Sequence, residues 1–221
     1  MQQYSSIPVA PTGASNQLPP INVPKQPSNW RGALSTLGIL IAAPLVALLL
    51  TAFVFQSYEV DGPSMETTLQ NRDRLIVWKI PRTLARITNH AYIPQRDDVI
   101  VFVKRGLYEQ EGAKEKQLIK RVIGLPGDRV VVQDGHITIY NSQNPSGFNP
   151  DQGHPFSQNI ASLTTGNMDI VVPPNEIFVC GDNRTNSLDS RSFGTISADD
   201  IVGRLVVRIF PVNGFKSFIK Q

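Results

Sequence analysis

Ser64 has the setting of a candidate nucleophile, because it lies in the stretch GPSMETTL, residues 62–69, shortly after a long apolar segment. A serine attacks a carbonyl group efficiently only when a neighbouring base removes its proton. A lysine can be that base when it is neutral, and burial among apolar side chains lowers its pKa. Lys120, in QLIKRVIGLPGD, is the candidate, because Leu118 and Val122 are expected on the same strand face. The pattern favours a Ser-Lys pair; the alternative is a structural lysine whose amine reaches solvent from a strand edge.

A polar segment later in the chain, GDNRTNSLDSRSFG at residues 181–194, could hold such a lysine in place. It carries a dense set of donors and acceptors: Asp182, Asn183, Arg184, Ser187, Asp189, Ser190 and Arg191. A hydrogen-bonded network of this kind can orient a buried amine. Within it, Asp189 and Arg191 could form an ion pair that stiffens the loop.

Other catalytic chemistries find less support. His90, His136 and His154 are available for a Ser-His-Asp arrangement, but none stands beside a distinctive motif. Cys180 is the only cysteine, which excludes an intramolecular disulfide and a zinc site built on several thiolates. We expect Cys180 to be a small buried residue, and we expect no metal and no cofactor.

One segment is long and apolar enough to cross a membrane. No charged residue occurs from Gly32 to Tyr58, and the 23 residues from Ala33 to Phe55 are almost all apolar. As a helix they cover roughly 34 Å, enough for a hydrocarbon core of ~30 Å. A cleaved signal peptide would have a shorter apolar core and a small-residue exit, and a buried globular helix would not be apolar on every face. A membrane anchor is therefore expected.

The charges suggest an orientation and exclude one class of partner. Lys25 and Arg31 precede the span and the first charge after it is Glu59, so the N-terminus is predicted to be cytoplasmic. The rest of the chain would then lie on the trans side, which is periplasmic, extracellular or lumenal. The net charge is only +3 and the charges after the span are nearly balanced, so we expect no nucleic acid partner.

The remaining chain predicts three regions: a disordered cytoplasmic tail over 1–30, the anchor over 31–57 and a β-rich domain over 58–221. Short runs rich in Val, Ile and Phe predict strands over 74–78, 98–103, 117–123, 129–133, 136–140, 169–172, 177–180 and 201–210. Asp134-Gly135 predicts a two-residue hairpin. Residues 141–168 are polar and read as an insertion. The pattern predicts a mostly β domain with a smaller inserted lobe.

At this point the chain resembles the type I signal peptidases, which are membrane-bound Ser-Lys endopeptidases that cut leader sequences from exported proteins. The resemblance is carried, in order, by SYEVDGPSMETTL, RDDVIVF, KRVIGLPGD and GDNRTNSLDSRSFG. It implies an antiparallel β-sheet catalytic domain with a smaller inserted β lobe, preceded here by one N-terminal transmembrane helix. The implied partners are exported preproteins with signal peptides and the lipid bilayer.

The resemblance also implies residue roles. Ser64 corresponds to the nucleophile and Lys120 to the general base, with Ser187 as the hydroxyl that hydrogen-bonds the lysine. Asp189 and Arg191 correspond to the structural ion pair of the family, and Arg121 to its second basic position.

The sequence departs from the family pattern at four points. Gly62 stands where some members have a serine that helps to stabilise the oxyanion. The oxyanion would then rely on the Ser64 backbone N–H and a second donor, for which the Gly62 backbone is a candidate. Thr67 and Asp97 stand where proline and glycine are common. The chain has one span before the nucleophile, whereas well-known members have two.

The expected function is removal of N-terminal signal peptides through an acyl-enzyme intermediate. Two alternatives remain open at this point: a self-cleaving Ser-Lys regulatory protease, and a non-catalytic membrane-anchored β module that binds partners.

Overall fold

The computed structural model describes residues 30–66, 68–105, 116–153, 160 and 163–218. Residues 1–29 of the predicted N-terminal tail, Thr67, His154 and part of the predicted insertion lie outside these residues. The chain divides into two units between Ala42 and Ala43, and every strand of the described residues belongs to the second.

The anchor is helical. Helix α1, Trp30–Leu49, contains Pro44 and continues into a π-helical turn, Leu50–Val54. Residues Leu34–Val54 form a helix long and apolar enough to span a membrane, and its side chains contact little of the protein. The backbone becomes extended at Phe55, where strand β1, Phe55–Glu59, begins. Residues 55–57 were predicted to end the anchor, and this prediction is wrong because they belong to the sheet.

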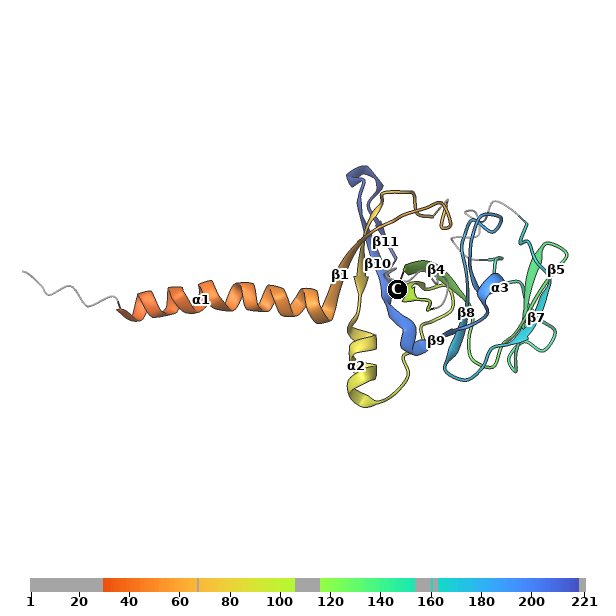
Figure 1. Ribbon diagram of the computed structural model, residues 1–221, viewed down its shortest axis with the longest axis horizontal. Coiled ribbons are helices and arrows are strands. Elements are labelled where there is room, and N and C mark those ends of the chain that lie inside the picture. Colours follow the sequence, from red (N-terminus) through yellow and green to blue (C-terminus); the bar gives the residue numbers. More distant parts are fainter. Residues whose placement is uncertain (1–29, 67, 106–115, 154–159, 161–162, 219–221) are drawn as a thin grey trace, which may run out of the picture. The chain divides into compact units, whose positions relative to one another are not determined.

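The larger sheet is antiparallel and has the order β1-β2-β10-β3-β4-β8-β9, with β11 paired to β10. Its further strands are β2 Arg74–Trp78, β3 Val99–Val103, β4 Gln117–Gly124, β8 Glu176–Cys180, β9 Ile196–Ser197, β10 Ile201–Phe210 and β11 Lys216–Ser217. Figure 1 shows β4 and β8 between β10 and the smaller sheet.

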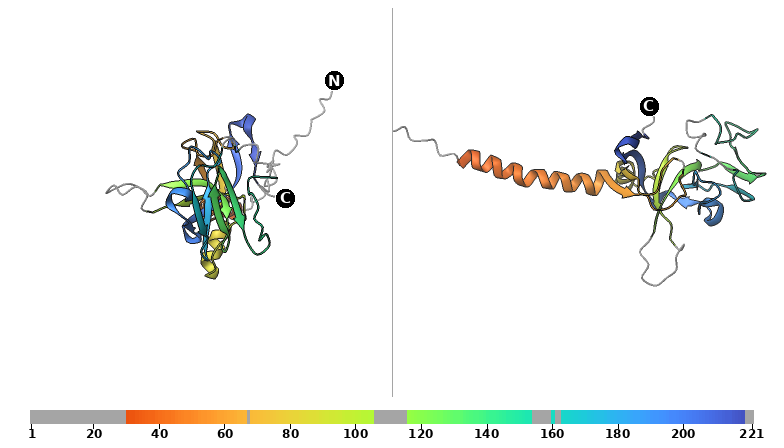
Figure 2. Two further views of the ribbon diagram at one scale, coloured as in Figure 1. Left: turned by 90° about the vertical axis from the view of Figure 1, so that its right-hand side faces the viewer. Right: turned by 90° about the horizontal axis from the view of Figure 1, so that it is seen from above.

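The smaller sheet has the order β6-β5-β7 and forms the inserted lobe. Its strands are β5 Arg129–Gln133, β6 His136–Tyr140 and β7 Met168–Val171. Asp134 and Gly135 join β5 to β6 with φ of 51° and 81°, the left-handed pair that a two-residue hairpin requires. Seen from above, this lobe lies at the end of the domain away from β1 (Figure 2).

The prediction of a mostly β, antiparallel fold is confirmed. All eight predicted strands are present, with ends that agree within one residue. Three strands were not predicted, β1, β9 and β11, and neither were helices α2, Ile80–Thr88, and α3, Ser190–Phe193. Short 3-10 turns also occur at Ala198–Asp200 and Val212–Gly214.

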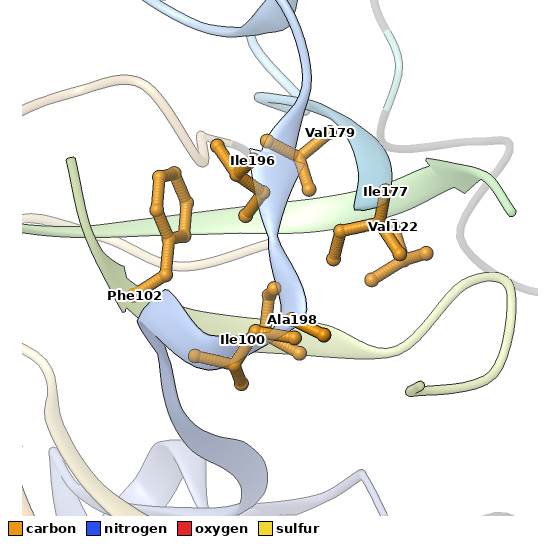
Figure 3. Close-up of a cluster of buried hydrophobic side chains, with 8 residues drawn as sticks. Ile100, Phe102, Val122, Ile177, Val179, Ile196 and Ala198 are labelled. Carbon is orange, nitrogen blue, oxygen red and sulfur yellow. The ribbon is translucent and has the colours of Figure 1, made fainter. Parts of the chain in front are cut away.

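Apolar clusters fix the strands that carry the candidate site. The cluster in Figure 3 joins β3, β4, β8, β9 and the start of β10 through Ile100, Phe102, Val122, Ile177, Val179, Ile196, Ala198 and Ile201. A second cluster contains Met65 and Leu69, which are both fully buried, together with Leu75 and Leu205. Since Met65 follows Ser64 directly, burial of this side chain holds the Ser64 segment against the sheet.

Candidate active site

Ser64 and Lys120 lie in hydrogen-bond contact, with 2.7 Å between Ser64 Oγ and Lys120 Nζ. Ser64 is in a turn in which the N–H of Glu66 donates to the carbonyl of Pro63. Lys120 is in β4, opposite Ile100 of β3. The sheet therefore brings together two residues that are 56 positions apart in the chain.

Lys120 is buried, with an exposed fraction of 3%. Burial lowers the pKa of its amine from the ordinary 10.5 to about 8, although the negative charge of Asp189 acts in the opposite direction. Roughly a tenth of the lysine is then neutral at pH 7. Its Nζ also lies 2.9 Å from the carbonyl oxygen of Ile119, which fixes the direction of the side chain.

The loop after β8 holds the backbone of the serine segment. The N–H of Asn183 donates to the carbonyl of Ser64 at 3.1 Å, and its side-chain amide donates to the carbonyl of Pro63 at 3.2 Å. A Cβ on Gly181 would lie 2.3 Å from the Ser64 carbonyl oxygen and 2.3 Å from Ser187 Oγ. Only glycine fits between them, so Gly181 allows the loop to approach Ser64 closely.

A groove of about 300 Å³ opens beside the pair. Ser64 and Lys120 line it, and most of its other lining is apolar, including Tyr58, Val60, Leu75, Val101, Leu118, Ile119 and Leu188. Along this groove, residues 117–120 of β4 pair with β3 on one side, whereas pairing with β8 starts only at Arg121. Within the described residues, no strand pairs with the second edge of residues 117–120.

Asp189 and Arg191 form the expected ion pair, with two parallel hydrogen bonds of 2.8 and 2.7 Å between the guanidinium and the carboxylate. Burial raises the pKa of Asp189, but the hydrogen bond and charge of Arg191 outweigh this effect and hold the pKa below its usual range. The same carboxylate accepts from the N–H of Gly181 at 3.0 Å and caps α3. The pair therefore stiffens the loop that approaches Ser64.

Arg121, the neighbour of Lys120, is bound on the opposite side by a buried carboxylate. Its Nε and Nη2 donate to Asp182 at 2.8 and 2.6 Å, and Asp182 also accepts from the hydroxyl of Thr68. Its Nη1 donates to the carbonyl of Asp97 at 2.8 Å. Arg121 thus links β4, the segment after Ser64 and the loop after β8.

Comparison with known proteins gives a family. The profile described as "Signal peptidase, peptidase S26" matches residues 33–210. The chain belongs to this family. It is 34% identical to signal peptidase I of Leptolyngbya laminosa over 88% of this chain and 87% of that one. It is also 34% identical to signal peptidase I of Bacillus caldolyticus, over 81% of this chain and 91% of the relative.

The chain is also similar to a signal peptidase I from Enterococcus faecalis V583 whose crystal structure is known. The two sequences are 28% identical, the match covers 52% of this chain and 97% of the other, and the TM-score is 0.39. As a member of the signal peptidase family, the chain is a serine endopeptidase with an N-terminal membrane anchor.

Ser187, the hydroxyl that the signal peptidase resemblance pairs with the lysine, lies near the site without a direct hydrogen bond to Lys120. Its hydroxyl is buried beside Asp189 and helps to hold the pKa of that carboxyl low, although within the described residues it meets the geometry of no ordinary hydrogen bond. Lys120 Nζ instead contacts Ser64 and the carbonyl of Ile119. Ser187 lies against Gly181, on the loop that holds Ser64, so its role as partner of the lysine stays a prediction.

Two of the positions at which the sequence departs from the family pattern have positive φ angles. Asp97 has a φ of 73°, a left-handed conformation in which glycine is the least strained residue. Gly62 has a φ of 103°, and its N–H donates to the side-chain oxygen of Asn71 at 3.1 Å. The backbone of Gly62 was the suggested second oxyanion donor, but here its N–H is already engaged.

Arg184 is a residue of the site that sequence reasoning named only as part of a polar loop. Its side chain is fully buried and donates to both carboxylate oxygens of Asp151 and, at 3.0 Å each, to Thr164 Oγ1 and the carbonyl of Gly181. Asp151 and Thr164 both belong to the inserted lobe, between β6 and β7. No fixed spacing links them to Arg184, so the sequence held no signal for this contact.

Proposed function

We propose that the protein removes signal peptides from exported preproteins, with Ser64 as nucleophile and Lys120 as general base. The observation that carries the proposal is the 2.7 Å contact between Ser64 Oγ and a buried lysine amine. A lysine whose pKa is about 8 is neutral often enough to accept a proton near neutral pH.

The reaction follows from the chemistry of this pair. Neutral Lys120 accepts the hydroxyl proton of Ser64 while Oγ attacks the scissile carbonyl carbon. The resulting ammonium then gives its proton to the leaving amine, and an ester to Ser64 remains. Lys120, neutral again, takes a proton from water as the water attacks the ester, which releases the new carboxylate and restores the serine.

The negative oxygen of each tetrahedral intermediate needs a donor. The N–H of Ser64 is the first candidate, since in the described residues no acceptor is recorded for it. Because the Gly62 N–H is held by Asn71, a second donor requires either a small movement of that turn or another group.

The substrate is proposed to bind as an extended strand. The unpaired edge of residues 117–120 offers backbone groups to a peptide, and addition of a strand to a sheet edge is a common mode of peptide recognition. The apolar groove lining suits small apolar side chains of a leader sequence. Such a strand would carry its scissile bond past Ser64.

The anchor places this site beside a membrane. Ser64 lies nine residues after Phe55, a distance of at most about 30 Å even when extended. We propose a cytoplasmic N-terminus and a catalytic domain on the trans side, where the cleavage site of an exported precursor emerges. Attachment of enzyme and substrate to one surface raises their effective concentration.

The test compares Ser64→Ala and Lys120→Met with the wild type, using the full chain in detergent and a precursor that carries a leader sequence. Both variants should lose cleavage, and N-terminal sequencing should show one new end after a small residue. Ser57→Ala and Lys216→Met, at exposed strand positions, are matched controls that should retain it. Full activity of Ser64→Ala or Lys120→Met would refute the assignment. Cleavage of the chain itself alone would favour the regulatory protease, and precursor binding without hydrolysis would favour the binding module.

A further inference from the structure

Helix α2, Ile80–Thr88, has an apolar face that the described structure leaves largely exposed at Leu84 and Ile87. Ile80, Leu84 and Ile87 follow the i, i+4, i+7 spacing that places side chains on one side of a helix. Leu84 is 54% exposed and Ile87 is 76% exposed. This is a large apolar exposure for a helix of nine residues.

The opposite side of α2 faces the catalytic domain. Arg82, which is half-buried, lines a polar pocket there together with Tyr92, Asn175 and Asp199, and Arg86 borders this pocket but is exposed to solvent. Arg82 Nη2 lies 3.4 Å from the carbonyl of Asp199. The helix is therefore oriented by the domain, with its polar side inward and its apolar side outward.

The start of α2 is bonded to the end of the membrane span. The N–H of Lys79 donates to the carbonyl of Val54 and its Nζ to the carbonyl of Ala52, both at 2.8 Å. The hydroxyl of Thr83 donates to the carbonyl of Phe53 at 3.2 Å. Figure 1 shows α2 beside the point where the anchor gives way to β1.

These contacts place α2 at the depth of the membrane surface. Ala52, Phe53 and Val54 are the last three residues of the span, and their carbonyls would otherwise lack partners in a helix that ends there. The Lys79 ammonium, which caps the carbonyl of Ala52, marks the level at which the chain leaves the hydrocarbon. Helix α2, with its apolar face, begins at the same level.

The charge of the segment that contains α2 indicates which kind of membrane surface it would bind. No acidic residue occurs from Lys79 to Arg96, whereas Lys79, Arg82 and Arg86 are basic, and Arg86 is exposed. Basic residues on the polar side of an amphipathic helix attract anionic lipid headgroups.

We propose that α2 is an interfacial helix that rests in an anionic phospholipid surface where the anchor emerges. Leu84 and Ile87 insert among the acyl chains, and the exposed Arg86 faces the phosphates. The catalytic domain then has a second membrane contact, which restricts its rotation about the connection to the anchor. This inference does not depend on the proteolytic reaction.

The test measures membrane depth directly on the full chain in phosphatidylcholine vesicles that contain phosphatidylglycerol. An environment-sensitive fluorophore is attached to Leu84→Cys, Ile87→Cys, Arg86→Cys or the distant control Ser142→Cys; the native Cys180 is buried and is not labelled. Circular dichroism confirms that each variant is folded. Lipids brominated on their acyl chains should quench the probe at 84 and 87 several-fold more than at 86, and should leave position 142 unquenched.

Quenching at 84 and 87 no stronger than at 142 would overturn the proposal. Protection of these positions that appears only at high protein-to-lipid ratio would also overturn it, because a second copy of the chain would then cover the face. Omission of phosphatidylglycerol, or added salt, should reduce quenching at 87. Quenching that does not change with lipid charge would refute the assignment of anionic headgroups.

Discussion

The buried lysine should make the stability of the protein depend on pH in a way that removal of the lysine abolishes. The pKa of Lys120 is lowered from 10.5 to about 8, and burial is the largest cause. Such a shift destabilises the folded state by about 3 kcal/mol at pH 7, since each pKa unit represents about 1.4 kcal/mol. The residue is only 3% exposed, so solvent screening reduces this cost little.

The sign follows from proton binding. Between pH 8 and 10.5 the unfolded chain binds the lysine proton while the folded chain has released it, so the stability of the wild type rises with pH. The cost is fully present below pH 8 and disappears as the pH approaches 10.5. In Lys120→Met this contribution is absent, so the difference in unfolding free energy between the two proteins should change by about 2 to 3 kcal/mol from pH 7 to pH 10.

Urea denaturation of the full chain in detergent micelles, followed by tryptophan fluorescence, measures this difference; Trp78 in β2 is a suitable reporter. Lys116→Met, at the exposed residue just before β4, removes a lysine without emptying a buried site and serves as the control. If the unfolding free energies of the wild type and Lys120→Met depend on pH in the same way, the amine is charged in the folded protein over this range. The assignment of Lys120 as general base would then be refuted.

Three further predictions concern the same site. The value of kcat/KM for a leader peptide should rise about tenfold per pH unit below pH 8 and level off above it, because only neutral Lys120 is active; a flat profile would contradict this. Gly181→Ala should lower kcat on the order of 100-fold, because its Cβ would lie 2.3 Å from the carbonyl oxygen of Ser64 and displace the nucleophile; unchanged kcat would contradict the close approach. Asp182→Asn should destabilise the fold by about 3 to 5 kcal/mol in urea denaturation, because it leaves the charge of Arg121 buried without a counterion. The double variant Arg121→Met, Asp182→Leu should recover most of that loss, and a fully stable single variant would refute the role of the pair.

Local sequence pattern predicted most of the sheet. Val131 and Ile137 belong to runs of β-branched residues, and Asp134-Gly135 can adopt the left-handed angles that a tight hairpin requires, so β5 and β6 were found at their correct ends. The short strands β9 and β11, with two residues each, were missed because they are strands only through their partners.

Helix α2 was missed for a different reason. Ile80, Leu84 and Ile87 have helical spacing, but the segment is short and contains Pro81 early, so the apolar pattern was weak beside the neighbouring strand. Proline is tolerated in the first turn of a helix, which is where Pro81 lies.

The candidate site shows the same limit. The Ser64–Lys120 pair was predicted from the residues around each member, and the structure places their side chains in contact. The engagement of Gly62 by Asn71 depends on the path of a turn, and the burial of Arg184 against Asp151 depends on how an insertion folds back. Neither has a fixed sequence spacing, so three-dimensional information was needed.

The contact between Arg184 and the inserted lobe has a consequence for anyone who wishes to shorten the protein. Asp151 and Thr164 look dispensable in the sequence, since they lie in a polar stretch between β6 and β7 far from the serine. Deletion of that stretch would leave the guanidinium of Arg184 buried without its partners. Arg184 is the residue after Asn183, whose N–H donates to the carbonyl of Ser64. A minimal enzyme designed around the larger sheet alone would therefore have to replace Arg184 with an apolar residue of similar volume at the same time as the lobe is removed.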